Sequence, residues 1–314
     1  MKKIQLSLAV IVAVLIIGTG IQHADAKAIG FAWVGKSGMA NRVTEGFEKG
    51  IKELAPDMAI EFHKELATLD ELSELSGKWR NQKDGMVILR SNGAEWLAQN
   101  PPNIPTFIGG CTHPSQLGAV KNLKVPEGNI TGVTYFLPVD TQFEIFQAII
   151  PNLKSVLLLV EKGHPSSEID QEGTRAICEK LGINYSEKIC ATPDEAITAV
   201  QQSNGKVSAI ILGNQALLFD NAAKLVQAAG KTPMLTYSEK PVKAGALGGF
   251  VADDVKLGYM LAQSVVDVLM KGKSIKEVPV KVDPNPKFII NAKTAQNLGL
   301  EIPYTILEAA TVIE

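Results

Sequence analysis

Short apolar segments alternate with amphipathic segments along this chain, in two separate series. Such alternation is typical of parallel sheets whose two faces are both covered by helices. The first series is predicted as strand Ala28–Val34, helix Met39–Leu54, strand Met58–Phe62, helix Leu69–Trp79, strand Met86–Leu89, helix Ala94–Gln99 and strand Thr106–Gly109. The second is predicted as strand Val156–Val160, helix Glu168–Leu181, strand Ile183–Ile189, helix Pro193–Ser203, strand Ala209–Leu212, helix Ala216–Ala229 and strand Met234–Thr236. The sequence therefore predicts an α/β fold of two lobes, each a doubly wound parallel sheet.

Three extended segments are predicted to connect the lobes. They are Gly128–Pro138, Ala246–Val251 and the proline-rich Val278–Pro286, and a long helix, Lys256–Met270, follows the second. Three crossings form a hinge, which absorbs the backbone rotation when a cleft between two lobes closes. We therefore assign residues 27–134 and 249–276 to lobe 1, and residues 135–248 and 277–314 to lobe 2.

Residues 1–26 have the pattern of a secretory signal peptide. Two lysines precede the apolar run Leu6–Ile17, and Ala24 and Ala26 are the small residues that a signal peptidase reads. The apolar run is short for a membrane span, which argues against a retained anchor. We expect cleavage after Ala26, a periplasmic location, and no membrane insertion of the mature chain.

The residues Gly30, Gly35, Lys36 and Ser37 match the phosphate-loop pattern G-x-x-x-x-G-K-S/T. A phosphate loop must follow a buried strand and curl, so that its backbone N–H groups point at the phosphates. The residues between the two glycines are bulky and apolar, and they continue a strand. We therefore interpret the match as accidental, with Ser37 at the start of a helix whose free N–H groups face a different ligand.

Charge and cysteine content exclude some classes of partner. The formal net charge is −2, which gives no electrostatic footprint for nucleic acid. There are three cysteines, Cys111, Cys178 and Cys190, and the odd count argues against a disulfide scaffold. Two alternatives stay open: a bond between Cys178 and Cys190 in an oxidising compartment, or three buried thiols, which we favour.

Ligands of open α/β sheets bind beyond the carboxyl ends of the strands, beside helix N-termini. Polar residues gather at these positions in both predicted lobes, and three aromatic residues lie close to them. Each alone is equally well explained as a helix cap or a core residue, but strand ends facing one crevice from two lobes favour a ligand site. The predicted ligand-binding residues are Trp33, Ser37, Met39, Arg90, Ser91, Asn92, Thr112, His113, Phe136, Ser166, Asn214, Gln215, Glu239 and Phe250.

Arg90 is one of only four arginines and directly follows the predicted strand Met86–Leu89. A guanidinium at the crevice end of a strand can hold a carboxylate through two parallel hydrogen bonds, which lysine does not imitate. We predict that Arg90 binds an anionic group of the ligand, assisted by Ser91. The alternative is a salt bridge at the rim of the cleft, with Glu95 or another acid.

Four segments of this chain resemble one family. GNITGVTYFLPVDTQFEIFQAIIPNLKSVLLLV, GALGGFVADDVKLGYMLAQ, FIINAKTAQNLGLEIP and GCTHPSQLGAV are similar to ABC transporter substrate-binding proteins of the tryptophan or aromatic-amino-acid type. The resemblance implies a type I periplasmic-binding fold and a small-molecule ligand that is carried to a membrane permease. Arg90, Glu161 and Asp254 depart from the family's usual residues on the cleft side, so the resemblance supports fold and role more than the identity of the ligand.

The sequence thus predicts an exported, monomeric solute-binding protein. Its expected ligand is a small organic molecule, amino-acid-like or carboxylate-bearing, that is captured between the lobes and delivered to an ABC permease. The alternatives are a sensory protein that presents its ligand to a receptor or kinase, and an enzyme. We expect no enzyme, metal or cofactor, because the chain has neither a G-x-S-x-G nor an H-E-x-x-H motif.

Overall fold

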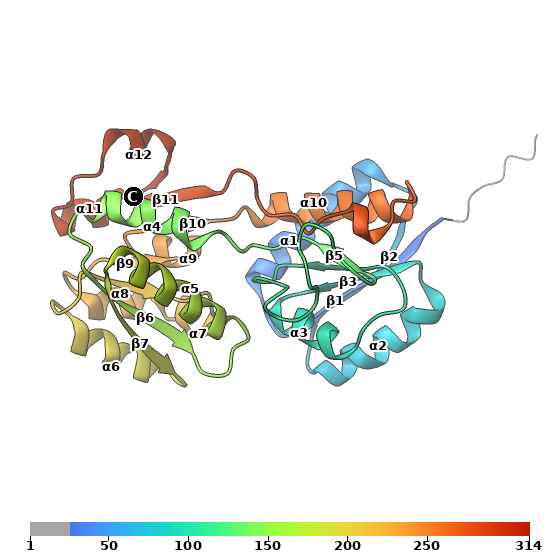
Figure 1. Ribbon diagram of the computed structural model, residues 1–314, viewed down its shortest axis with the longest axis horizontal. Coiled ribbons are helices and arrows are strands. Elements are labelled where there is room, and N and C mark those ends of the chain that lie inside the picture. The colour runs from blue at the N-terminus through green and yellow to red at the C-terminus, as the bar shows by residue number, and fades with distance from the viewer. Residues whose placement is uncertain (1–25) are drawn as a thin grey trace, which may run out of the picture.

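The computed structural model describes residues 26–314, so the predicted signal peptide lies almost wholly outside the described residues. Figure 1 shows two lobes side by side, each built around its own sheet. The predicted α/β fold of two lobes is thereby confirmed. None of the helices between residues 26 and 314 is long and apolar enough to cross a membrane.

The sheet of lobe 1 has five strands in the order β2-β1-β3-β4-β5, and all of its pairings are parallel. The central strands β1 and β3 are buried almost throughout, which explains their continuous apolar sequences. The strands are β1 (Ala28–Val34), β2 (Ala59–Leu66), β3 (Gly85–Leu89), β4 (Thr106–Gly109) and β5 (Ile130–Gly132).

Four helices cover this sheet, and the last comes from much later in the chain. They are α1 (Gly38–Leu54), α2 (Leu69–Gln82), α3 (Ser91–Gln99) and α10 (Asp254–Leu269). Helices α1 and α10 lie unusually close together. A Cβ on Gly46 would lie 1.8 Å from the carbonyl oxygen of Val255, and one on Gly258 would lie 2.0 Å from that of Val43. Glycine is therefore required at both contacts.

The sheet of lobe 2 has seven strands in the order β12-β11-β10-β9-β8-β6-β7. One of its pairings, β10 with β11, is antiparallel, because the chain leaves for lobe 1 after β10 and returns in the opposite direction. The predicted parallel sheet therefore contains one antiparallel pairing. The strands are β6 (Ser155–Glu161), β7 (Asn184–Cys190), β8 (Ala209–Leu212), β9 (Met234–Thr236), β10 (Gly248–Val251), β11 (Lys287–Asn291) and β12 (Thr311–Ile313).

The helices of lobe 2 begin where its strands end. They are α4 (Val139–Ile149), α5 (Ser166–Leu181), α6 (Pro193–Ser203), α7 (Ala216–Asp220), α8 (Ala222–Ala229), α9 (Glu239–Lys243), α11 (Ala292–Leu298) and α12 (Tyr304–Ala309). The single helix predicted over Ala216–Ala229 is two helices, because the backbone of Asn221 leaves the helical region at φ −109° and ψ 11°. A 3-10 turn, η1 (Ile275–Glu277), precedes the last connection.

The chain crosses between the lobes at positions that differ from the sequence-based boundaries. Strand β10 pairs within the sheet of lobe 2, although the prediction assigns most of it to lobe 1. Val280 packs in a core cluster of lobe 1, and the backbone N–H of Lys281 donates to Gly132, although the prediction assigns both to lobe 2. We propose that the crossings are residues 134–138, 252–253 and 282–286, which Figure 1 shows between the lobes.

The second and third crossings are tied together by a buried acid, Asp283, which is 3% exposed. Its Oδ2 accepts a hydrogen bond from the backbone N–H of Asp253 at 2.8 Å, and its Oδ1 accepts one from Lys256 Nζ at 2.7 Å. These hydrogen bonds join the two connections at this end of the hinge.

The three cysteines are unpaired and buried, so the favoured alternative of buried thiols is the one that the structure has. Burial raises the pKa of each thiol, to about 12 for Cys111 and to about 11 for Cys178 and Cys190. They are therefore protonated at neutral pH and act as small apolar side chains.

Candidate functional site

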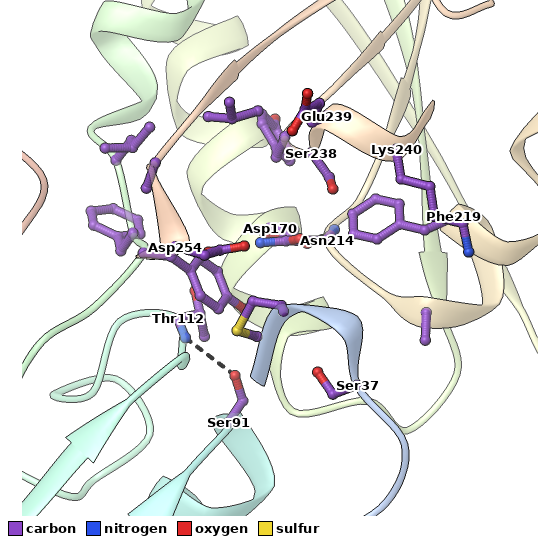
Figure 2. A pocket seen from close by; sticks show the side chains of 18 of the residues that line it. Ser37, Ser91, Thr112, Asp170, Asn214, Phe219, Ser238, Glu239, Lys240 and Asp254 are labelled. Atoms are coloured by element: carbon purple, nitrogen blue, oxygen red, sulfur yellow. Dashed lines mark hydrogen bonds between the residues drawn. The ribbon is translucent and has the colours of Figure 1, made fainter. Parts of the chain in front are cut away.

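A cavity of about 820 Å³ lies between the lobes, at the carboxyl ends of strands from both sheets. Seven helices of the described chain begin at its walls, namely α1, α3 and α10 from lobe 1 and α4, α5, α7 and α9 from lobe 2. Figure 2 shows side chains of both lobes pointing into this space. The volume is that of a site for a small organic molecule, and the free N–H groups of helix N-termini favour negatively charged groups nearby.

Most of the predicted ligand-binding residues line this cavity, and their role in binding stays a prediction. Those that line it are Ser37, Met39, Arg90, Ser91, Asn92, Thr112, Phe136, Asn214, Glu239 and Phe250. Those that do not are Trp33, His113, Ser166 and Gln215.

The predictions that Trp33 and His113 contact a ligand are corrected, because neither side chain lines the cavity. Trp33 is fully buried in the core of lobe 1, where its ring lies edge-on to Phe31 with centroids 6.1 Å apart. Side chains alternate between the two faces of a strand, and that of Trp33 lies on the face that packs beneath α1 and α10. His113 packs its ring against Phe136, at 4.7 Å between centroids, and supports the wall from behind.

Ser166 and Gln215 hold a carboxyl group that the sequence analysis missed, that of Asp170 on α5. Gln215 Nε2 donates both to Ser166 Oγ at 3.0 Å and to Asp170 Oδ2 at 2.6 Å. The backbone N–H of Asn214 donates to the same Oδ2 at 2.8 Å. Ser166 and Gln215 are almost completely buried, so they position Asp170 and do not themselves face the cavity.

Asp170 lines the cavity as an acid without a cationic partner. Both of its hydrogen bonds come from neutral amide groups and both reach Oδ2, which leaves Oδ1 without a donor among residues 26–314. Burial raises the pKa of Asp170 to about 6, and the two hydrogen bonds offset this only in part. A carboxylate in such surroundings is stabilised by a ligand that brings a positive charge.

The wall of lobe 1 opposite Asp170 is built from hydroxyl groups and helix N-termini. Ser37 caps α1 by accepting from the N–H of Ala40 at 3.1 Å, and Ser91 Oγ accepts from the N–H of Thr112 at 3.2 Å, as Figure 2 shows. Burial raises the pKa of the Tyr135 hydroxyl beside them, so it stays protonated. The first N–H groups of α1 and α3 have no acceptors within their helices. This wall is suited to a carboxylate.

Arg90 lines the cavity, but part of its guanidinium is already engaged. Its Nη1 donates to the carbonyl oxygen of Val34, and a Cβ on Gly35 would lie 2.8 Å from the same nitrogen. The backbone of Arg90 has a φ of 76°, an uncommon value for a residue other than glycine and one often found at functional sites. Burial lowers the pKa of Arg90, and the charge of Glu161 on lobe 2 counteracts this. Its binding of a ligand anion stays a prediction.

His164 comes from lobe 2 and lines the same part of the cavity as Arg90. Burial, and after it the charge of Arg90, lowers the pKa of His164 to about 4. The imidazole is therefore neutral at pH 7, and its Nδ1 lies 2.8 Å from Ser166 Oγ. His164 supplies a hydrogen-bonding group to the wall and no charge.

Asp254 is a second acid of the cavity, at the start of α10 in lobe 1. Arg42 on α1 donates to it from Nε at 3.0 Å and from Nη2 at 2.8 Å. Burial nevertheless raises the pKa of Asp254 to about 6, since the ion pair with Arg42 compensates only in part.

The remaining wall is apolar and aromatic, and it comes from both lobes and the crossings between them. Sequence reasoning found three of these residues and missed the aromatic rings of Tyr135, Phe219 and Tyr237. The predicted Glu239 lies at the rim, where its carboxylate pairs with Lys243 at 2.7 Å. The aromatic residues of the wall are Tyr135, Phe136, Phe219, Tyr237 and Phe250, and its aliphatic residues include Met39, Leu137, Val139 and Ile169.

Two sheet lobes around an interlobe cavity, with the strand order β2-β1-β3-β4-β5 in lobe 1, are the architecture of a type I periplasmic binding protein, and the comparisons agree. The family model of ABC transporter substrate-binding proteins matches residues 33–313, and the chain belongs to this family. A curated relative, the tyrosine-binding protein of Clostridioides difficile (strain R20291), is 24% identical over 283 residues, which are 88% of this chain and 81% of the relative. The resemblance inferred from the sequence is confirmed.

Solved structures show the same arrangement. The crystal structure of an ABC domain in complex with L-Trp from Streptococcus pneumonia has a TM-score of 0.80 and 26% identity, and covers 92% of this chain and 100% of that one. The ligand-free, open structure of a substrate-binding protein with adhesive properties from Clostridium difficile has a TM-score of 0.77 and 21% identity, covering 92% and 99%. The second similarity supports the fold alone.

Residues 26–314 contain no group of three or more His, Cys, Asp or Glu side chains that are arranged to hold a metal ion. The relatives described above are binding proteins. The groups that surround the cavity are a wall of hydroxyl and N–H groups, two acids with a raised pKa, and aromatic rings.

Proposed function

We propose that this protein captures an aromatic α-amino acid as a zwitterion in the interlobe cavity and delivers it to the permease of an ABC transporter. Membership of the substrate-binding family supports the transport role. One relative is named for tyrosine binding, and another was solved in complex with L-Trp. Both support an aromatic amino acid as the ligand class. We further propose that the protein binds without catalysing a reaction on its ligand.

The observation that carries this proposal is the unpaired carboxyl group of Asp170. It faces the cavity from lobe 2 with one oxygen free of hydrogen-bond donors from residues 26–314. The opposite wall offers Ser91, Thr112 and the N-termini of α1 and α3. An ammonium group beside Asp170 and a carboxylate beside the helix N-termini complement the two walls together.

This arrangement also couples binding to closure of the cleft. The groups that complement the carboxylate belong to lobe 1, and Asp170 belongs to lobe 2. A zwitterion between them gains its full set of contacts only when the lobes come together, which shifts the population toward a closed form. The aromatic side chain then occupies the part of the cavity bordered by Met39 and Phe250.

We propose a periplasmic location and a monomeric mature protein that begins at Lys27. The predicted signal peptide supports export, and the family supports a permease as the partner. The sensory alternative, with a receptor or kinase as the partner, shares this cavity. Co-purification with a permease, as opposed to a sensor kinase, separates the two.

The test is calorimetric titration of the mature protein with L-tyrosine, L-tryptophan and L-phenylalanine. Each is compared with two truncated analogues of tyrosine: tyramine, which lacks the carboxylate, and the phenolic propionate, which lacks the ammonium group. We expect the aromatic amino acids to bind, and each truncated analogue to bind at least about a hundredfold more weakly, because it loses charge-assisted hydrogen bonds. Equal affinity for tyramine or for the propionate contradicts the proposal.

A further inference from the structure

Asp254 has one carboxyl oxygen that the protein leaves unused. Arg42 Nε and Nη2 both donate to Oδ2, so the guanidinium does not use both oxygens in the parallel geometry common for such pairs. No donor among residues 26–314 bonds Oδ1, and this atom is not sealed from solvent. The side chain is 14% exposed and lines the cavity. Oδ1 is therefore a free acceptor at the cavity wall.

The close packing of α1 on α10 fixes where this acceptor lies. Gly46 and Gly258 allow the two helices to approach until backbone atoms touch. Arg42 lies one turn before Gly46, and Asp254 lies one turn before Gly258, so the same contact brings their side chains together at the start of α10. The carboxyl group is held on a rigid pair of helices, and Figure 2 shows it pointing into the space that Asp170 also faces.

A purely structural role does not account for this geometry. The N-cap of α10 is Asp253, which accepts from the N–H of Lys256 at 3.1 Å and pairs with Lys287 at 2.6 Å, so both of its oxygens are used. At the rim, Asp220 pairs with Lys240 at 2.5 Å. Asp254 lies deeper than Asp220, and unlike Asp253 it keeps an oxygen free.

We propose that Asp254 determines specificity by accepting a hydrogen bond from a donor on the distal end of the ligand's side chain, a phenol hydroxyl or an indole N–H. The inference rests on the proposed function, in which Asp170 takes the ammonium group. Arg42 already neutralises the charge of Asp254, so the complement of Oδ1 is a neutral donor and not a second cation. A purely hydrocarbon ring would strip water from Oδ1 and return no hydrogen bond, which disfavours it.

The test uses ligand pairs that differ in this donor alone. Calorimetry compares L-tyrosine with L-phenylalanine, and L-tryptophan with the derivative methylated on the indole nitrogen. In the wild type we expect the donor-bearing member of each pair to bind about ten- to a hundredfold more tightly. The double variant Asp254→Leu with Arg42→Leu, which leaves no unpaired charge, should reduce both ratios to about one. Asp254→Asn should also lose the preference, because its oxygen keeps the hydrogen bonds from Arg42 and its amide N–H₂ group, a donor, takes the place of Oδ1.

Asp267→Asn is the matched control. It removes a partly buried, lysine-paired carboxylate from the far end of the same helix α10. We expect it to keep both wild-type ratios. Equal binding of tyrosine and phenylalanine by the wild type overturns the inference, and so does an unchanged ratio in the double variant. A loss of all amino acids to the same degree in Asp254→Asn would instead identify Asp254 as the ammonium site and also overturn it. If the wild type binds none of the four ligands, the proposed function itself fails.

Discussion

Replacing Asp170 by asparagine tests the central feature of the cavity, because it removes one charge and almost no volume. The side-chain oxygen of asparagine accepts the same hydrogen bonds from the N–H of Asn214 and from Gln215 Nε2. Its amide nitrogen then takes the place of the free oxygen that faces the cavity. The variant therefore keeps the local packing and loses the negative charge alone.

The empty protein should become more stable. The pKa of Asp170 is about 6 in the folded chain and 3.8 as its ordinary value, so between about pH 4 and pH 6 the folded state holds a proton that the unfolded state has released. For an acid with a raised pKa the favourable contribution is complete below about 4 and is lost as the pH rises toward 6. At pH 7, where both states are ionised, the raised pKa of Asp170 corresponds to a cost to the folded state of at most about 3 kcal/mol, which Asp170→Asn relieves. Water in the cavity reduces the gain.

Binding should change in the opposite direction. An ammonium group loses its ionic acceptor and meets an amide N–H₂ group, which is itself a donor. Charge-assisted hydrogen bonds contribute about 1.5–3 kcal/mol each, and the repulsion between donors adds to the loss. We expect the affinity of Asp170→Asn for L-tyrosine to fall by at least about a hundredfold.

The assay combines thermal unfolding of the empty proteins at pH 7 with calorimetric titration of each. Asp170→Asn should raise the Tm by several degrees, at about 2–4 °C per kcal/mol for a protein of this size, and should bind weakly. Glu168→Gln is the control, because Glu168 is an exposed acid on the same helix and should change neither quantity. A lower Tm would show that the Asp170 charge stabilises the fold, and wild-type affinity would show that it does not contact the ligand; either result refutes the reasoning.

Four further outcomes are expected. The affinity of the wild type for L-tyrosine should fall by up to about tenfold per pH unit below about pH 6, where Asp170 becomes protonated in the empty cavity, and a flat calorimetric profile from pH 5 to 8 would contradict this. Gly258→Ala should lower the free energy of unfolding in urea by about 1–3 kcal/mol, because its Cβ would lie 2.0 Å from the carbonyl oxygen of Val43, and unchanged stability would disprove the close contact. Arg90→Lys should weaken calorimetric binding about ten- to a hundredfold, nearly as much as Arg90→Ala, while full affinity in Arg90→Ala would reject the contact. Intact-mass measurement of exported protein should give Lys27 as the first residue, and a membrane-bound species retaining Met1 would argue against cleavage.

The fold is largely predictable because each segment of the sequence shows the apolar periodicity and the length of its strand or helix. Strands such as Ala28–Val34 and Ala209–Leu212 have the predicted bounds. The sequence predicts β10 as a connection between the lobes, because its two glycines weaken the strand signal. Packing against the neighbouring strands requires these glycines. A Cβ on Gly249 would lie 2.6 Å from the carbonyl oxygen of Thr236, and one on Gly248 would lie 3.0 Å from that of Ile289. A local pattern does not contain this constraint.

The location of the site is predictable, but its charged groups are not. The rule that ligands lie beyond the carboxyl ends of strands finds Ser91, Thr112 and Asn214 from the chain alone. Asp170 lies inside a helix, where an acid usually belongs to a solvated face. The one local signal is its position four residues after Ser166, on the same face of α5. Its burial depends on Gln215, which is 45 residues away in the chain.

The direction of the pKa shift distinguishes Asp170 and Asp254 from the other acids with a resolved shift, including Asp253, which lines the cavity but has a lowered pKa. Among residues 26–314, the acids with a raised pKa are Asp170 and Asp254, and both line the cavity. Acids elsewhere with a resolved shift have a lowered pKa, as Glu61 does at about 2 through hydrogen bonds to Lys83 and Trp79. A lowered pKa means that the carboxylate stabilises the folded chain at neutral pH, and a raised one means that it does not. In the empty cavity each lobe therefore contributes one carboxyl group that lowers the stability of the folded chain. A ligand with an ammonium group and a distal hydrogen-bond donor compensates both of these costs.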